Sequence, residues 1–219
     1  MERSTMVVLV MMGLMMMAMG LSPMNSLPPI LSRSRRPPRK QHARMARWLI
    51  SQASWGTLST TSLHLNGTAF GNIASFSDGP SHNSTGVPYF YLTEMDFTLQ
   101  DVKADPRCSL TVTEASLKYG HCRGIDVEDP VCVRVVLSGK LAKVGDEEVT
   151  FAEDALFHKH PEMRWWPKAH NFSTYKLAVE NIFLLDFFGP PAQPSVEEYF
   201  AAAAAAATSV DELGAVEEQ

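Results

Sequence analysis

An Asn-Gly pair at Asn66 and Gly67 constrains the fold more than any other feature of this sequence. The pair lies between two runs rich in β-branched and apolar residues, Thr57–Leu65 and Ala69–Phe76. Asn and Gly adopt positive φ at low cost, so such a pair between two strand-like runs favours a type I′ turn. The two runs are therefore predicted to pair as antiparallel strands.

Four further segments have the composition of strands. In Cys108–Thr113, apolar residues alternate with Ser and Thr, as expected for a strand with one buried face. The other three are rich in apolar, β-branched or aromatic residues: Val87–Leu92, Cys132–Val144 and Tyr175–Phe188. Their spacing and the short turns between them favour a barrel over a parallel sheet.

Helical spacing of apolar residues is found in three segments. In Gln41–Ser54 the apolar residues fall on one face, and Arg44 and Arg47 are expected on the other. The other two segments are Leu99–Lys103, which Pro106 ends, and Phe151–His158. Because strands outnumber helices, the predicted fold class is β-rich α+β, a barrel of mostly antiparallel strands with a few peripheral helices.

Residues 1–21 have the parts of a secretory signal peptide: a charged start, an uncharged apolar stretch at Met6–Leu21, and small residues at its end. A membrane anchor is the alternative, but a span needs about 20 apolar residues, and Ser22 and Pro23 end this run early. A transit peptide is a second alternative, against which the long apolar run argues. The chain is predicted to enter the secretory pathway without a stable membrane span.

Residues 22–41 alternate Ser, Pro, Arg and Lys, a composition that cannot bury enough apolar area to fold alone. We interpret this segment as a solvated basic linker or a pro-segment. Within it, Arg33–Arg36 matches a dibasic processing site and also a nuclear-localisation run, which the leader argues against. Residues 42–200 remain for one domain. Residues 201–219 begin with alanines that prolong a helix from Val196–Phe200 and are predicted to fray or to be disordered.

The charge is distributed unevenly along the chain. The first 47 residues hold 8 of the 19 basic residues and 1 of the 24 acidic ones. The remainder therefore carries 11 basic and 23 acidic residues, a formal charge of -12. So acidic a body repels phosphates, which argues against a nucleic-acid partner.

Three Asn-x-Ser/Thr sequons, at Asn66, Asn83 and Asn171, lie in predicted turns and are candidate glycosylation sites. The turn alone also accounts for an Asn at position 66, because a type I′ turn requires a positive φ there. An exported chain with three cysteines is expected to form one disulfide. Cys122 and Cys132 bracket a polar loop and are the favoured pair. Cys108 is expected to be a buried thiol, because it alternates with core residues. The alternative is a disulfide that includes Cys108.

Three histidines, at positions 158, 160 and 170, lie near Glu162 and form a candidate metal or acid–base site. Their spacing matches no standard zinc pattern, and the prolines and tryptophans between them favour a turn that follows a helix. The sequence contains no nucleophile elbow, phosphate loop or dinucleotide fingerprint. No catalytic residue and no metal ligand is therefore assigned.

Six stretches form one pattern in this order: Ala53–Leu58, Phe76–Gly79, Gly86–Leu92, Leu137–Lys140, His160–Met163 and Trp166–Asn171. Together they resemble the CREG family of secreted cellular-repressor glycoproteins. The resemblance runs from about Ala43 to Phe200 and leaves out the leader, the linker and the alanine tail.

The resemblance implies a split β-barrel of the type used by FMN-binding pyridoxamine-phosphate oxidases, normally a homodimer. It also implies export, delivery to endosomes and lysosomes, a protein receptor or sorting partner, and a role in growth restraint and differentiation. CREG proteins are generally regarded as having lost flavin binding, so no cofactor is expected.

The flavin members of this fold imply where a flavin phosphate would be held. They place a Thr at the end of the strand equivalent to Val87–Leu92, and here that residue is Thr93. Counting back from Pro106 without gaps, their Ser position falls at Asp96 and their Lys position at Thr98. A hydroxyl thus replaces the cation and a carboxylate is added beside it, so FMN binding is disfavoured.

Two functions follow from the sequence. The first is a non-catalytic secreted or endolysosomal glycoprotein that binds protein partners. The alternative is an FMN-binding oxidoreductase of the pyridoxamine-phosphate-oxidase-like superfamily.

Overall fold

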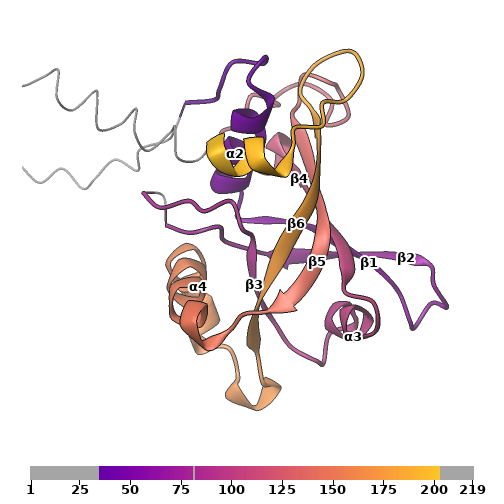
Figure 1. Ribbon diagram of the computed structural model, residues 1–219, viewed down its shortest axis with the longest axis vertical. Coiled ribbons are helices and arrows are strands. Elements are labelled where there is room, and N and C mark those ends of the chain that lie inside the picture. Colours follow the sequence, from indigo (N-terminus) through magenta and orange to yellow (C-terminus); the bar gives the residue numbers. More distant parts are fainter. Residues whose placement is uncertain (1–34, 81, 203–219) are drawn as a thin grey trace, which may run out of the picture. The chain divides into compact units, whose positions relative to one another are not determined.

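The computed structural model describes residues 35–80 and 82–202. Six strands form one sheet in which every neighbouring pair is antiparallel. Their order is β2 (Ala69–Ser75), β1 (Trp55–Thr61), β4 (Arg107–Thr113), β5 (Arg134–Lys143), β6 (Ser173–Leu185) and β3 (Tyr89–Leu92). In Figure 1 the long strands β5 and β6 cross β1 and β2 as the sheet curls into a half-barrel. The predicted β-rich split barrel is confirmed.

Strands β1 and β2 form the predicted hairpin, and Asn66 and Gly67 have positive φ values of 53° and 89°. The connection nevertheless spans residues 62–68, because the N–H of Gly67 donates to the carbonyl of Ser62 over 2.7 Å. The expectation that the first strand continues to Leu65 is therefore wrong. The chain already turns at Ser62, and the Leu65 side chain is exposed.

The other predicted strands are present, with ends shifted by at most three residues. β5 pairs with β6 along its whole length, and a bulge interrupts the register between Ser138 and Gly139. A Cβ atom at Gly139 would lie 1.9 Å from the carbonyl oxygen of Ala178 on β6. Only glycine allows the two backbones to approach so closely at the bulge.

The two edges of the sheet meet at one point. Ser77 follows β2, Tyr89 begins β3, and these residues exchange two backbone hydrogen bonds of 3.1 and 2.8 Å. Because β2 and β3 are the edge strands, this bridge joins the edges and brings the loop 78–86 across one end of the sheet.

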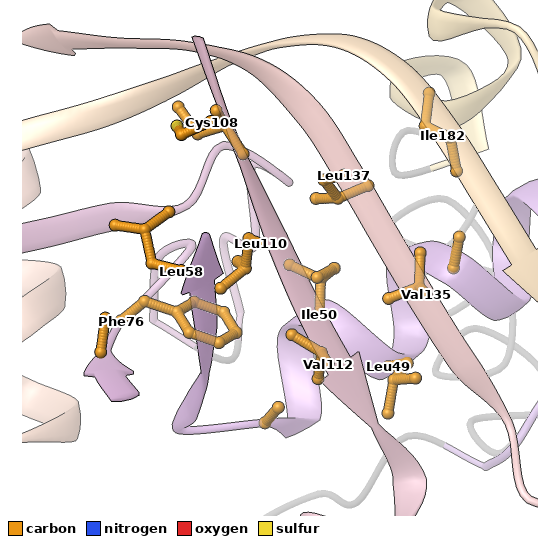
Figure 2. Packing of buried hydrophobic residues seen from close by; sticks show 14 of the residues in the cluster. Leu49, Ile50, Leu58, Phe76, Cys108, Leu110, Val112, Val135, Leu137 and Ile182 are labelled. Carbon is orange, nitrogen blue, oxygen red and sulfur yellow. The ribbon is translucent and has the colours of Figure 1, made fainter. Parts of the chain in front are cut away.

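Helix α2 (His42–Gln52) covers one face of the sheet, as its apolar spacing predicts. Met45, Leu49 and Ile50 of this helix are fully buried in the main core cluster, together with inward residues of β1, β4 and β5. Figure 2 shows Leu49 and Ile50 near Val112 and Val135 of the strands. These large side chains hold the helix against the sheet.

The expectation that Arg47 lies with Arg44 on the solvent side of α2 is wrong. Arg47 is 5% exposed, whereas Arg44 is exposed. The loop 78–86 covers Arg47, whose Nη2 atom donates to the carbonyl and hydroxyl oxygens of Ser84 over 2.7 and 3.0 Å. Helical spacing places a residue around the helix axis, but it does not show which distant loop covers it.

Two further helices and three 3₁₀ turns lie between α2 and the helical residues 196–202. Helix α3 (Phe97–Ala104) packs against β1, and helix α4 (Asp146–Lys159) packs on β3 (Figure 1). α4 begins five residues before the predicted Phe151, with three acidic residues in its first turn that suit the positive end of the helix dipole. The 3₁₀ turns are η1 (Glu114–Ser116), η2 (Pro161–Trp165) and η3 (Lys168–His170).

Cys122 and Cys132 form a disulfide with a Cα–Cα distance of 5.2 Å, which closes the loop between β4 and β5. This is the pair that the intervening polar loop favours. Cys108 is a free, buried thiol. Burial raises its pKa to about 12, so the thiol stays protonated at neutral pH.

Residues 196–202 are helical, as predicted for the start of the last helix, and Tyr199 within them is fully buried. The predicted signal peptide, residues 22–34 of the linker and the tail after residue 202 lie outside the described residues. Across 35–80 and 82–202, no helix has the length and apolar character needed to cross a membrane.

Candidate functional site

A cavity of about 430 Å³ lies where β2 and β3 end, beside the segment that leads from α4 to β6. Its lining is mainly apolar and aromatic, and Thr93 and Asp96 are among its polar residues. Apolar walls with a few convergent polar groups are the usual form of a small-molecule site. The cavity is therefore lined by two of the three residues, Thr93 and Asp96 but not Thr98, that the resemblance places at the flavin phosphate.

Stacked aromatic rings form one wall of this cavity. Tyr91 of β3 stacks on Phe172 and Trp166, with ring centroids 5.1 and 6.0 Å apart, and Phe157 contacts Tyr91 edge-on at 5.4 Å. Burial raises the pKa of the Tyr91 phenol, with a smaller contribution from Glu153, so the ring stays neutral. The wall offers a flat π surface to a planar ligand.

The polar residues of the cavity already have partners within the chain. The Thr93 hydroxyl donates to the carbonyl oxygen of His170 over 2.5 Å and accepts from the N–H of Met95 over 3.3 Å. The Asp96 carboxylate caps helix α3 by accepting the N–H of Thr98 over 2.8 Å. The start of the helix, which is where an anion would bind, therefore already holds a carboxylate.

The third position, Thr98, does not face the cavity. Thr98 is 2% exposed, and its hydroxyl accepts from the Asn72 side chain over 3.0 Å. The same Asn72 amide donates to both oxygens of Asp96, at 3.2 and 3.1 Å. A phosphate brought to this place would meet a carboxylate and two occupied hydroxyls, so these residues do not fit the phosphate of FMN.

The match to protein families agrees with this architecture. Residues 37–201 match the family model described as CREG, beta-barrel. The chain belongs to the CREG family. It is 39% identical to protein CREG1 of Homo sapiens over 176 residues, which are 80% of this chain and 77% of that protein. It is 41% identical to protein CREG2 of Mus musculus over 164 residues, which are 74% of this chain and 57% of that protein.

Solved structures share the fold of this CREG chain at low sequence identity. A heme binding protein from Mycobacterium smegmatis matches with a TM-score of 0.61 and 18% identity, over 75% of this chain and 61% of that one. A protein of unknown function from Agrobacterium tumefaciens matches with a TM-score of 0.58 and 17% identity, over 76% of this chain and 64% of that one. The chain thus spans less than two thirds of each structure, and the likeness shows the fold alone.

The structure does not bring together the three histidines of the candidate metal or acid–base site. His158 is exposed at the end of α4, whereas His160 is buried with its Nε2 atom 3.0 Å from the carbonyl oxygen of Phe76. His170 instead lies beside Phe172, with ring centroids 6.1 Å apart. Within the described ranges, no three His, Cys, Asp or Glu residues form a group that could hold a metal ion.

The three sequon asparagines, Asn66, Asn83 and Asn171, are all exposed, as a glycan requires. Asn66 and Asn171 have left-handed backbones, with φ values of 53° and 51°. Asn83 lies in the loop 78–86, which crosses one end of the sheet. Their use as glycosylation sites in this CREG chain stays a prediction.

A buried ionic cluster, which sequence reasoning missed, anchors the loop that carries Asn83. Arg47, Asp78 and Ser84 form it: Asp78 is 1% exposed, its Oδ2 atom accepts from the Ser84 hydroxyl over 2.5 Å, and the same oxygen lies 3.7 Å from Arg47 Nη1. Within the described residues, Arg47 Nε and Nη1 and Asp78 Oδ1 have no hydrogen-bond partner. Helical spacing did not point to this cluster, because it placed Arg47 with Arg44 on the solvent side of α2.

Lys159 at the end of α4 reaches the same cluster. Its Nζ atom lies 3.9 Å from Asp78 Oδ1 and donates to the carbonyl oxygens of Ser51 and Ala53 over 3.3 and 2.9 Å. Burial lowers the pKa of Lys159, while the charge of Asp78 opposes that shift. The cluster therefore ties α2, α4 and the Asn83 loop to one another.

Proposed function

We propose that this CREG chain is an exported glycoprotein of the extracellular space or of endosomes and lysosomes. It acts without catalysis, by binding protein partners in the control of growth and differentiation. The observation that carries the proposal is Asp96, whose carboxylate occupies the start of α3 where a flavin phosphate would need positive or neutral groups. The exposed sequons and the disulfide support an exported chain.

Loss of flavin binding is tested by purifying the glycosylated chain from secretory cells and adding FMN. We expect a colourless protein without the flavin absorbance at about 450 nm, and no quenching of FMN fluorescence on titration. Asp96→Ser removes the charge and keeps a capping hydroxyl, and Asp105→Ser is the matched control at the C-terminal end of α3. A yellow wild-type protein would overturn the proposal in favour of the FMN-dependent oxidoreductase.

Partner binding is tested with the labelled, purified chain on intact cells. We expect saturable binding that protease treatment of the cells abolishes and that Asp96→Ser leaves unchanged, because the cavity is not the contact surface in this proposal. Binding that disappears when the cells are treated with glycosidase alone would point to a carbohydrate receptor instead. A chain with no saturable binding to any cell tested contradicts the proposal.

The proposed assembly is a homodimer that pairs the outer faces of β4 and β5. The middle of that face is half-buried and uncharged at Ser109, Thr111, Val136 and Ser138, and the hydroxyls of Ser109 and Ser138 are 2.9 Å apart. Arg107, Lys140 and Arg134 lie at its ends. Ser138→Arg should convert the dimer to a monomer in light scattering, whereas Gln100→Arg, at an exposed position of α3, should not. A wild-type monomer would refute the assembly without affecting the flavin argument.

A further inference from the structure

Glu114, which follows β4, is a fully buried carboxylate. Its Oε1 atom accepts from the backbone N–H of His121 over 3.0 Å and lies 2.7 Å from the Nδ1 atom of the same residue. The turn around it is tight, because a Cβ atom at Gly120 would lie 2.4 Å from the Glu114 carbonyl oxygen. A carboxylate enclosed in this way needs a cation against its second oxygen.

That cation is Arg36, a residue of the basic segment. Its Nε atom donates to Glu114 Oε2 over 3.2 Å, and only 15% of its side chain is exposed. The composition of residues 22–41 predicts a solvated linker, but Arg36 is largely buried against the domain. Seventy-eight residues separate the two partners in sequence.

The site makes contacts that suit a guanidinium group rather than any other cation. While Nε of Arg36 meets the carboxylate, Nη2 donates to the carbonyl oxygen of Val131 over 3.3 Å. Val131 precedes Cys132, so the disulfide fixes the second acceptor in place. An ammonium group is a point charge and lacks a planar fork with two donors held at this spacing.

We propose that Glu114 and the Val131 carbonyl form a guanidinium-binding site, which Arg36 fills from within the chain. The same site accepts the arginine of a separate basic peptide once Arg36 is removed. Cleavage after Arg36 would empty the site, and cleavage before it would leave the site filled. This site is separate from the cavity near Asp96 and does not depend on whether that cavity binds flavin.

The surface beside the site suits a basic peptide. The disulfide loop exposes Val127, which is 63% exposed, between the acidic residues Asp126 and Glu128. The disulfide loop thus presents an exposed apolar side chain between two acidic ones. A peptide with an arginine and flanking positive charges would match this pattern.

The test uses the full chain and a labelled peptide of residues 31–40, which contains Arg36. We expect the peptide to bind Arg36→Ala chain at least about tenfold more tightly than wild-type chain, whose site is filled. A peptide with Arg36→Ala keeps the other basic residues and should lose this binding. Equal binding of both peptides, or equal binding by both chains, would show surface charge attraction only and overturn the proposal.

A second measurement does not depend on the peptide. Arg36→Ala chain should melt at a lower temperature than wild type, and millimolar methylguanidinium should restore its melting temperature while methylammonium should not. The Arg36→Ala, Glu114→Gln double variant should show no such rescue. Equal effects of both cations on the single variant would refute a guanidinium site even if the double variant fails to fold.

Discussion

Replacing Arg47 by Met should destabilise the domain strongly, although the substitution lies in a helix that tolerates Met by propensity. Arg47 is 5% exposed and holds Ser84 through two hydrogen bonds of 2.7 and 3.0 Å. Its guanidinium also lies 5.1 Å from the centre of the Tyr199 ring. Arg47→Met removes these contacts and leaves Asp78 without its arginine partner.

The magnitude follows from what Asp78 keeps. Removing one partner of a buried ion pair typically costs about 3 to 5 kcal/mol. Asp78 retains the Ser84 hydroxyl at 2.5 Å, the Gly86 N–H at 3.3 Å and Lys159 at 3.9 Å, which places the cost at the lower end. We therefore expect a loss of about 3 kcal/mol and a melting temperature lower by about 6 to 12 °C.

The assay is thermal and urea unfolding followed by circular dichroism. Arg44→Met is the matched control, because Arg44 is exposed on the same helix and its side chain donates to the Gln41 side chain. It should change stability by less than about 0.5 kcal/mol. In the double variant with Asp78→Asn, the loss should be smaller than the sum of the single losses by about 1 kcal/mol or more. A loss of stability in Arg47→Met no larger than that in Arg44→Met would show that the buried cluster does not stabilise the domain.

Three further outcomes follow from the described contacts. Iodoacetamide should label Cys108 only in denaturant. Folding raises the pKa of the Cys108 thiol from 9.0 to about 12. The stability that the protonated thiol contributes is therefore complete below pH 9.0 and is lost as the pH rises toward 12. Cys108→Ala should not show this loss of stability between pH 9.0 and 12. Replacing Cys122 and Cys132 by Ser should cost about 3 kcal/mol in urea unfolding, because the bond closes a loop with a sequence separation of 10; no change in the midpoint would contradict this. Asn83→Gln should remove one glycan by mass, whereas Ser84→Ala keeps the sequon and should lower stability by about 1 to 2 kcal/mol without changing the mass of the glycans.

The strands and the hairpin were predictable because their signals are local. Alternation in Cys108–Thr113 and the Asn-Gly pair at Asn66 act within a few residues, and the structure has a strand and a turn at these places. The end of the first strand was misplaced for a physical reason. Leu65 is apolar, as strand composition requires, but the chain turns at Ser62 and leaves Leu65 exposed.

The buried charges were not predictable, because their partners are distant in sequence. Ser84 is 37 residues from Arg47, and Glu114 is 78 residues from Arg36. Composition alone treats an arginine as solvated, and only the folded chain shows which carboxylate or carbonyl it meets. The cavity was found in part: the resemblance led to Thr93 and Asp96, but it could not show that Asp96 caps α3 or that Thr98 is buried.

In both sites of this CREG chain, the chain itself supplies the group that a ligand would supply. At the cavity the Asp96 carboxylate lies where an anion would bind, and at the disulfide loop Arg36 lies where a basic peptide would bind. The two differ in how they can be vacated. Asp96 is bonded to the first turn of α3, so moving it would unravel the helix start, which costs about 1 kcal/mol or more. Arg36 lies at the N-terminal side of the domain, beyond α2, and one backbone cut after it would separate it from the fold. The Asp96 carboxylate therefore stays in the cavity as long as α3 keeps its first turn, whereas the guanidinium site opens when the basic segment is removed.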